Sequence, residues 1–298
     1  SGLAGGRRFL LQEDRAGASG AESRRGQRRR LRLMVLGRWR VEEARNAELY
    51  DELLQMLHSL LLQCGAGIDA DGPGAFVRLS TRSPKDALRE LKLLSLSSVG
   101  VLDGAASVVT AAWSALRVQT AEEALDLLLS SERVVEDIRA AEFYGLPMPQ
   151  LVARQWMGSM DPTLEFRLFV ADSVLTAACS YHADCYVPAV LRHRTAVERQ
   201  LRFFWNEVIR PLAPSDCRDY TVDVVLMQVD ACVTGVQPST LARVIEVNHP
   251  PPVASTILFD WTSAADHGVL TTGPFELRVV EKEADPRRLL ERLLGESS

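Results

Sequence analysis

The sequence lacks the features that mark membrane, secreted and zinc-binding proteins. No uninterrupted apolar run in its 298 residues approaches the roughly 18 residues that a membrane-spanning helix needs. Its five Cys residues are odd in number and form no Cys-x-x-Cys pair, so neither a disulfide framework nor a zinc module is favoured. The sequence therefore predicts a globular intracellular protein that makes no membrane contact.

Common catalytic and nucleotide-binding motifs are also absent. The sequence contains no Gly-x-Ser-x-Gly, no Gly-x-Gly-x-x-Gly and no Gly-x-x-x-x-Gly-Lys-Ser/Thr. The five His residues show no metal-ligand spacing. These absences disfavour an activated-serine hydrolase, a Rossmann domain and a P-loop domain, so any nucleotide site must use another scaffold.

Charge is distributed unevenly along the chain. Residues 1–40 hold eleven Arg against three acidic residues, a net charge of +8, whereas the remaining residues carry −13. We interpret residues 1–40 as a flexible basic arm, and three alternatives stay open for it: a polyanion-binding segment, a remnant of a mitochondrial presequence, or a solvated tail. Residues 41–148 then form an N-terminal lobe and residues 149–298 a C-terminal lobe.

Hydrophobic periodicity, capping residues and turn signals predict an α+β fold. The second half is mostly antiparallel, with a hairpin at Ala171-Asp172-Ser173. Helices are expected at 41–63, 84–94, from 120 towards 138, 196–209, 254–262 and 286–294. Strands are expected at 75–79, 151–156, 165–170, 174–180, 220–229 and 241–248.

Two expected strands carry polar side chains that share a face. Side chains alternate along a strand, so Asp223 lies opposite an apolar face, and Glu246 and Asn248 project together from the second strand. If the strands pair in antiparallel fashion, the three side chains converge as hard oxygen donors suited to magnesium. The alternative is an ordinary half-exposed sheet with polar residues facing water.

Three Arg residues interrupt strand-like segments: Arg78, Arg154 and Arg167. A buried guanidinium needs an anionic partner to offset its desolvation. A bound phosphate would serve, and so would a carboxylate of the protein itself. For Arg167 the internal explanation is an ion pair with Glu165, two positions earlier.

The order of several segments resembles the cell division cycle protein 123 family, which has an ATP-grasp-type fold. The resemblance spans roughly residues 76–261, and five motifs in order make it fairly specific. They are Phe76–Ala87, Leu151–Trp156 with Glu165–Val170, Asp219–Val224, Ile245–Pro250, and Leu258–Trp261.

The resemblance implies a two-lobed ATP-grasp-like protein that binds ATP and Mg²⁺. Arg78 stands where the family has its phosphate-binding Lys, and Arg167 would face the phosphates. Asp223, Glu246 and Asn248 match the family's metal-binding acids and Asn. The remaining ATP-binding positions by resemblance are Ser80, Ser83, Lys85, Val152, Arg154 and Trp156.

The family is known for helping to assemble eukaryotic translation initiation factor 2, so the resemblance implies a cytoplasmic assembly factor, or chaperone, whose partner is the gamma-type subunit. Three departures mark a divergent member: Glu246 replaces an Asp, Pro250-Pro251-Pro252 replaces a Gly-containing loop, and Ser180-Tyr181-His182-Ala183 replaces Gln-Arg-Asp-Tyr. One alternative is an RNA- or ribonucleoprotein-associated protein, for example of the mitochondrial ribosome, with weakened or lost nucleotide binding. The other is an ATP-dependent carboxylate–amine ligase.

Overall fold

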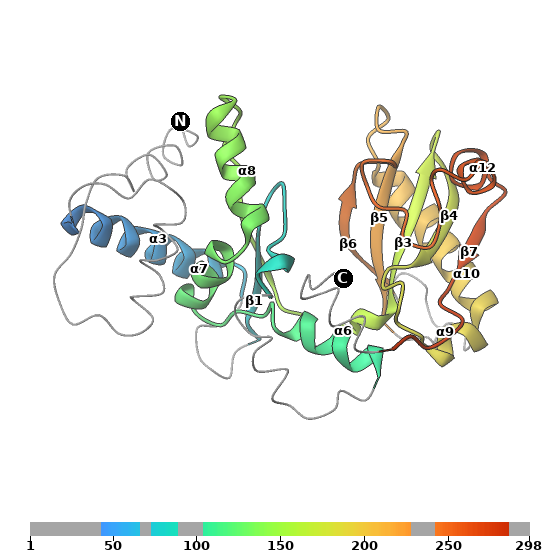
Figure 1. Cartoon of the computed structure of the whole chain (residues 1–298), viewed down its shortest axis with the longest axis horizontal. Helices are drawn as coiled ribbons and strands as arrows, with labels where there is room; N and C mark the ends of the chain where they lie inside the picture. Colours follow the sequence, from blue (N-terminus) through green and yellow to red (C-terminus); the bar gives the residue numbers. More distant parts are fainter. Residues whose placement is uncertain (1–42, 66–72, 89–103, 228–241, 286–298) are drawn as a thin grey trace. The chain divides into compact units, whose positions relative to one another are not determined.

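The computed structural model describes residues 43–65, 73–88, 104–227 and 242–285, and they form two compact units (Figure 1). The first unit contains the described residues up to 88 and residues 114–158; the second contains residues 104–113 and 159–285. The expected arm at 1–40 and the expected helix at 286–294 lie outside the described residues. No helix in the described ranges is both long and apolar enough to cross a membrane.

The first unit packs helices against a two-stranded sheet. Strand β1 (Ala75–Leu79) pairs antiparallel with β2 (Leu151–Gln155), which places Arg78 opposite Val152. Helices α3 (Glu43–Gln63) and α7 (Ala121–Leu129) supply core residues such as Leu61 and Ala124. Strand β2 belongs to this unit, which extends to residue 158, whereas the expected lobe boundary lies after residue 148.

Capping residues divide the helical stretch after residue 120 into two helices. Thr120 caps α7 by accepting a hydrogen bond from the Glu123 backbone N–H. Ser131 caps α8 (Glu132–Phe143) in the same way, through the Val134 N–H. A Ser at this position offers the backbone a hydrogen bond that ends one helix and begins the next. The expectation of one helix running on from residue 120 was therefore wrong at Ser131.

The second unit is built on a mixed five-stranded sheet in the order β6-β5-β3-β4-β7. Pairing is antiparallel throughout, except that β7 runs parallel to β4. The strands are β3 (Glu165–Ala171), β4 (Val174–Ser180), β5 (Tyr220–Leu226), β6 (Ala242–Asn248) and β7 (Glu276–Arg278). The unit also contains α6 (Ala105–Ser114), α9 (Pro188–Arg192), α10 (Arg194–Phe204) and α12 (Ala264–Thr272). The α+β class is confirmed.

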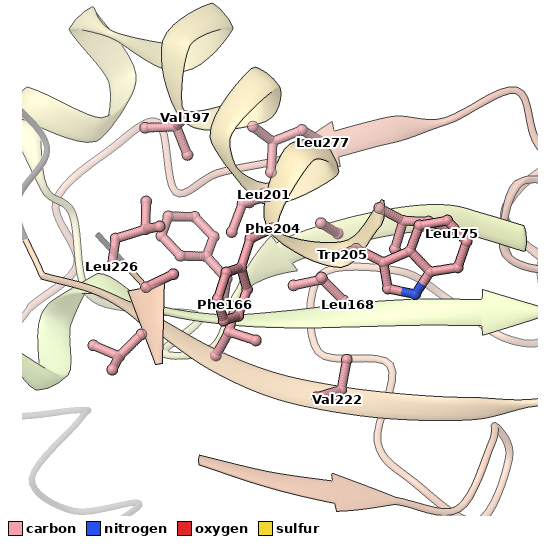
Figure 2. Close-up of a cluster of buried hydrophobic side chains, with 14 of the residues drawn as sticks. Phe166, Leu168, Leu175, Val197, Leu201, Phe204, Trp205, Val222, Leu226 and Leu277 are labelled. Carbon is pink, nitrogen blue, oxygen red and sulfur yellow. The ribbon is translucent and has the colours of Figure 1, made fainter. Parts of the chain in front are cut away.

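Helix α10 covers one face of this sheet, and the chain continues from it as one π-helical turn, Trp205–Ile209. Figure 2 shows the buried cluster in which Leu201 and Phe204 lie near Phe166 and Leu168. Strand residues alternate faces, so the neighbours of Phe166 and Leu168 on β3, namely Glu165 and Arg167, project from the opposite face. The core thus presents the polar residues of β3 on the side away from α10.

Two further expected helices differ from the structure. The segment expected at 84–94 begins as a 3-10 turn, Lys85–Ala87, and residues from 89 onwards lie outside the described residues. The helix expected at 254–262 was wrong, since Ile257 has a left-handed φ of 58° that an α-helix cannot contain. The helix of this region is α12, which begins at Ala264.

Candidate functional site

A row of mostly polar residues crosses the second unit's sheet on the face opposite α10. The strand registers place Glu246 opposite Asp223, Asp223 opposite Arg167, Arg167 opposite Cys179, and Cys179 opposite Arg278. Directly opposed residues of neighbouring strands project to the same face of a sheet. The sheet itself therefore brings two acids, two guanidinium groups and a thiol into one line.

The centre of the row is a bidentate ion pair between Arg167 and Asp223. Arg167 Nε donates to Asp223 Oδ1 at 2.7 Å, and Arg167 Nη2 donates to Oδ2 at 2.7 Å. The exposed fraction is 6% for Arg167 and 0% for Asp223. The planar guanidinium matches the carboxylate with two parallel hydrogen bonds, the strongest common form of such a pair. The internal partner of Arg167 is therefore Asp223 and not the expected Glu165.

Burial and charge act in opposite directions on this pair. Burial raises the pKa of the Asp223 carboxyl above its ordinary value, while the hydrogen bonds and charge of Arg167 oppose the rise. Burial acts to lower the pKa of Arg167, but the hydrogen bonds and charge of Asp223 outweigh it and raise that pKa. The guanidinium therefore stays charged, and Asp223 depends on it for compensation.

Hydrogen bonds from Arg167 and Thr221 connect the sheet to the loop after β6. Arg167 Nη1 donates to the Ser255 carbonyl oxygen at 2.9 Å, and the Arg167 guanidinium lies 5.2 Å from the centre of the Tyr181 ring. Thr221 Oγ1 donates to the His249 carbonyl at 3.2 Å. The loop is thus held against the polar row by side chains of β3 and β5.

The three residues expected to bind magnesium do lie near one another. Asp223 pairs in register with Glu246, and Asn248 Nδ2 donates to Asp223 Oδ2 at 3.0 Å. Glu246 and Asn248 are half-buried, and Glu246 has an interaction partner of its own. The alternation of side chains along the two expected strands therefore predicted correctly that these residues share one face of the sheet.

The arrangement of these residues does not fit a magnesium ion. Mg²⁺ requires a near-octahedral shell of oxygen ligands. Both Asp223 oxygens accept hydrogen bonds from Arg167, and Asn248 turns its amide nitrogen, a donor, towards the same carboxylate. Within the described ranges, no group of three or more His, Cys, Asp or Glu residues could hold a metal ion.

The expected phosphate-binding residues of the first unit occupy a strand and the turn after it. Arg78 is half-buried in β1 and its Nε donates to the Leu79 carbonyl at 2.9 Å. Ser80 Oγ accepts a hydrogen bond from the Gln150 N–H at 3.0 Å. Ser83 is buried, and Lys85 begins the 3-10 turn. Only Arg78 and Lys85 of this group offer a positive charge.

Asp86, in the same motif (Phe76–Ala87), has a structural role. Asp86 accepts a hydrogen bond from Ser131 Oγ at 2.6 Å through Oδ1 and one from the Arg133 backbone N–H at 3.1 Å through Oδ2. Its carboxylate therefore lies at the N-terminal end of α8, where a negative charge is favourable. This contact explains the acid of the Pro-Lys-Asp-Ala motif without a ligand.

The remaining expected residues lie on or beside β2. Arg154 is exposed, while Val152 and Trp156 are half-buried. Of the three strand Arg residues, only Arg167 is a buried guanidinium; Arg78 is half-buried and Arg154 is exposed. The expected site residues fall on both units, and their convergence into one nucleotide site stays a prediction.

Sequence reasoning missed a second Arg–acid network on the same sheet face. Arg278 Nη1 and Nη2 donate to Asp266 Oδ2 and Oδ1 at 2.8 and 2.6 Å, and Arg278 Nε donates to Glu276 at 2.7 Å. The Arg278 guanidinium also lies 4.1 Å from the centre of the Phe259 ring. Arg278 thereby links α12 to the edge strand of the sheet. The sequence did not reveal this network because β7, with three residues, is too short to show a periodic pattern.

It also missed a contact between the buried Glu165, at the start of β3, and the half-buried His182. Glu165 is 5% exposed, and its Oε2 lies 3.7 Å from His182 Nε2. Glu165 Oε1 and His182 Nε2 are buried and have no hydrogen-bond partner among the described residues. Glu165 thus adds a second carboxylate near Asp223, whose pKa its charge helps to raise.

Comparison with known proteins identifies the chain's relatives. The D123 family model matches residues 105–294. Cell division cycle protein 123 of Eremothecium gossypii is 26% identical over 227 residues, which are 75% of this chain and 54% of that protein. The chain therefore spans about half the length of that curated relative.

Two solved structures share the fold. Cdc123 from Schizosaccharomyces pombe matches with a TM-score of 0.56 and 22% identity, over 78% of each chain. A C-terminally truncated form of the same protein matches with a TM-score of 0.56 and 21% identity, over 78% of this chain and 79% of that one. These matches and the family model confirm the resemblance read from the motifs, and the chain belongs to the D123 family.

Proposed function

We propose that this chain binds ATP and acts as an assembly factor for a multisubunit protein of the cytoplasmic translation apparatus. The observation that carries the proposal is the Arg167–Asp223 pair. It is a buried, bidentate ion pair at the centre of the motifs on which the family resemblance rests. ATP acts mainly as a ligand that orders the protein, and turnover is not part of the proposal.

The residues of each unit suit the phosphates of a nucleotide in different ways. On the second unit, Arg167 is held by Asp223 in a fixed orientation, so its guanidinium is preorganised. On the first unit, Arg78 and Lys85 supply positive charge beside a turn fixed by Ser80. The resemblance pairs the nucleotide with magnesium, but the arrangement of Asp223, Glu246 and Asn248 does not fit that ion, so the proposal concerns ATP alone.

Calorimetric titration of ATP into the full chain tests nucleotide binding. We expect a saturable heat for the wild type and a loss of at least about tenfold in affinity for Asp223→Asn, because Arg167 then loses its orienting partner. Asp172→Asn makes the same chemical change on a side chain that is 73% exposed, and it serves as the matched control. Indistinguishable heats for the wild type and Asp223→Asn would remove the proposal.

The assembly role is tested with the gamma-type subunit of translation initiation factor 2 as the probe. We expect the full chain to form a complex with that subunit in analytical ultracentrifugation, and ATP to increase the fraction bound. Sedimentation of the two proteins as separate species, with and without ATP, would contradict the assembly role. That result would not bear on the proposal that the chain binds ATP.

A contact with RNA is favoured by the net charge of +8 in residues 1–40. Arg-rich segments bind phosphate backbones with an affinity that falls as salt rises. We expect deletion of residues 1–40 to abolish a salt-sensitive association with RNA. An unchanged association after the deletion would exclude this role for the arm.

A further inference from the structure

The acid cluster of the polar row contains its own counter-charge. Asp223 stands directly opposite Glu246 in the register of β5 and β6, and Glu165 projects from the same sheet face two residues before Arg167 on β3. Against these acids the structure sets the guanidinium of Arg167, with both of its hydrogen bonds to Asp223 at 2.7 Å. A buried carboxylate needs such compensation, whether it comes from a side chain or from a metal ion.

The hydrogen bonds to Asp223 leave little room for a second cation. A carboxylate has about four lone-pair sites. Arg167 takes two of them and the Asn248 amide takes a third, and the exposed fraction of Asp223 is 0%. A divalent ion at Asp223 would have to displace a bidentate guanidinium and turn over the Asn248 amide.

We infer that Arg167 is the resident cation of this cluster, in the position where the family resemblance places magnesium, and that the cluster binds divalent metal only when Arg167 is removed. Arg167 also reaches the Ser255 carbonyl, so it performs a second task of a central ion, which is to hold a loop against the sheet. The inference deepens the proposed nucleotide site. Its test uses no nucleotide, so either idea can fail alone.

The test is a titration of the full chain with Mn²⁺, followed by water-proton relaxation and by thermal melting in EDTA or excess Mg²⁺. We expect no saturable site in the wild type below a dissociation constant of about 1 mM, and melting that is indifferent to metal. Arg167→Gln exposes the carboxylates without a counter-charge. We expect it to bind Mn²⁺ at least about tenfold more tightly than the wild type and to melt higher when metal is added.

Two control variants separate charge from geometry. Arg167→Lys keeps a positive charge without the bidentate fork, and we expect it to be less stable yet still indifferent to metal. Arg167→Gln combined with Glu246→Gln removes one acid of the cluster, and we expect it to lose part of the gained Mn²⁺ affinity.

Two results would overturn the inference. The first is a saturable Mn²⁺ site in the wild type that Glu246→Gln weakens. The second is a folded Arg167→Gln protein that binds Mn²⁺ no better than the wild type. If Arg167→Gln does not fold, the wild-type titration decides alone: a site sensitive to Glu246→Gln refutes the inference, and metal-indifferent melting without such a site supports it.

Discussion

The Arg167–Asp223 pair is a buried charge pair whose halves depend on one another. Replacing Arg167 by Met leaves Asp223 buried and uncompensated, and we expect the free energy of unfolding to fall by about 3–5 kcal/mol. Arg202 and Glu198 form an exposed i,i+4 pair at 3.3 Å on α10, so Arg202→Met should change stability by less than about 1 kcal/mol. Denaturant unfolding of the two variants measures both values. Equal losses would show that burial of the Arg167 pair has no special weight.

Cys179 lies in the polar row between Arg167 and Arg278, yet it is not a reactive thiol. Burial raises the pKa of Cys179 to about 12, and the lowering effect of the two Arg charges is smaller. At neutral pH we therefore expect Cys179 to resist alkylation in the native protein while the half-buried Cys64 and Cys217 react. Peptide mass spectrometry after brief iodoacetamide treatment measures this. Alkylation of native Cys179 as fast as in unfolded protein would contradict it.

Asp266 gives the second Arg network a dependence on pH. Its hydrogen bonds with Arg278 lower the pKa of Asp266 from 3.8 to about 2. A lowered folded-state pKa contributes stability above 3.8, and that contribution is lost as pH falls towards 2. The stability difference between the wild type and Asp266→Asn should therefore shrink across this window. Denaturant unfolding at a series of pH values measures the difference, and a constant gap would exclude this role for Asp266.

Helix α10 has one face buried against the sheet and one face exposed, as the periodicity of its apolar residues predicts. Leu201 is fully buried between α10 and the sheet, whereas Phe203 on the same helix is 40% exposed. Leu201→Ala should cost about 2–5 kcal/mol of unfolding free energy, because it leaves a cavity in a tightly packed cluster. Phe203→Ala should cost less despite removing a larger side chain. Denaturant unfolding of both variants tests the assignment of faces, and the reverse order would refute it.

The strands that carry the candidate site were predictable, and their register was not. Alternation placed Asp223 and Glu246 on one face, and the structure pairs them directly. The partner of Arg167 is 56 residues away on β5, and nothing within β3 alone specifies which residue of β5 stands opposite. A local ion pair with Glu165 was therefore predicted in place of the cross-strand pair.

The region after β6 was the least predictable part of the fold. Its apolar run suggested a helix, but Phe259 and Leu270 pack against the sheet from an irregular loop and from α12. Ile257, two residues before Phe259, has a left-handed φ of 58°, which excludes the expected helix. Tertiary packing fixes such segments, so their local sequence pattern misleads.

The expected nucleotide-binding residues divide between the two units. Arg78, Ser80 and Lys85 lie in the first, and Arg167 and Asp223 lie in the second. The family motifs predicted both sets from sequence. Which groups meet around a ligand depends on the placement of one unit against the other, and no local pattern encodes that.

We propose that ATP binds at the guanidinium held by Asp223, and nuclear magnetic resonance of the Arg side-chain Nε–H groups during an ATP titration tests this contact. Because Arg167 Nε donates to Asp223, its resonance should be protected from exchange, and Arg167→Lys should remove it. We predict that ATP shifts this resonance saturably. Saturable ATP binding that leaves the Arg167 resonance unmoved, or no ATP binding at all, would contradict the account.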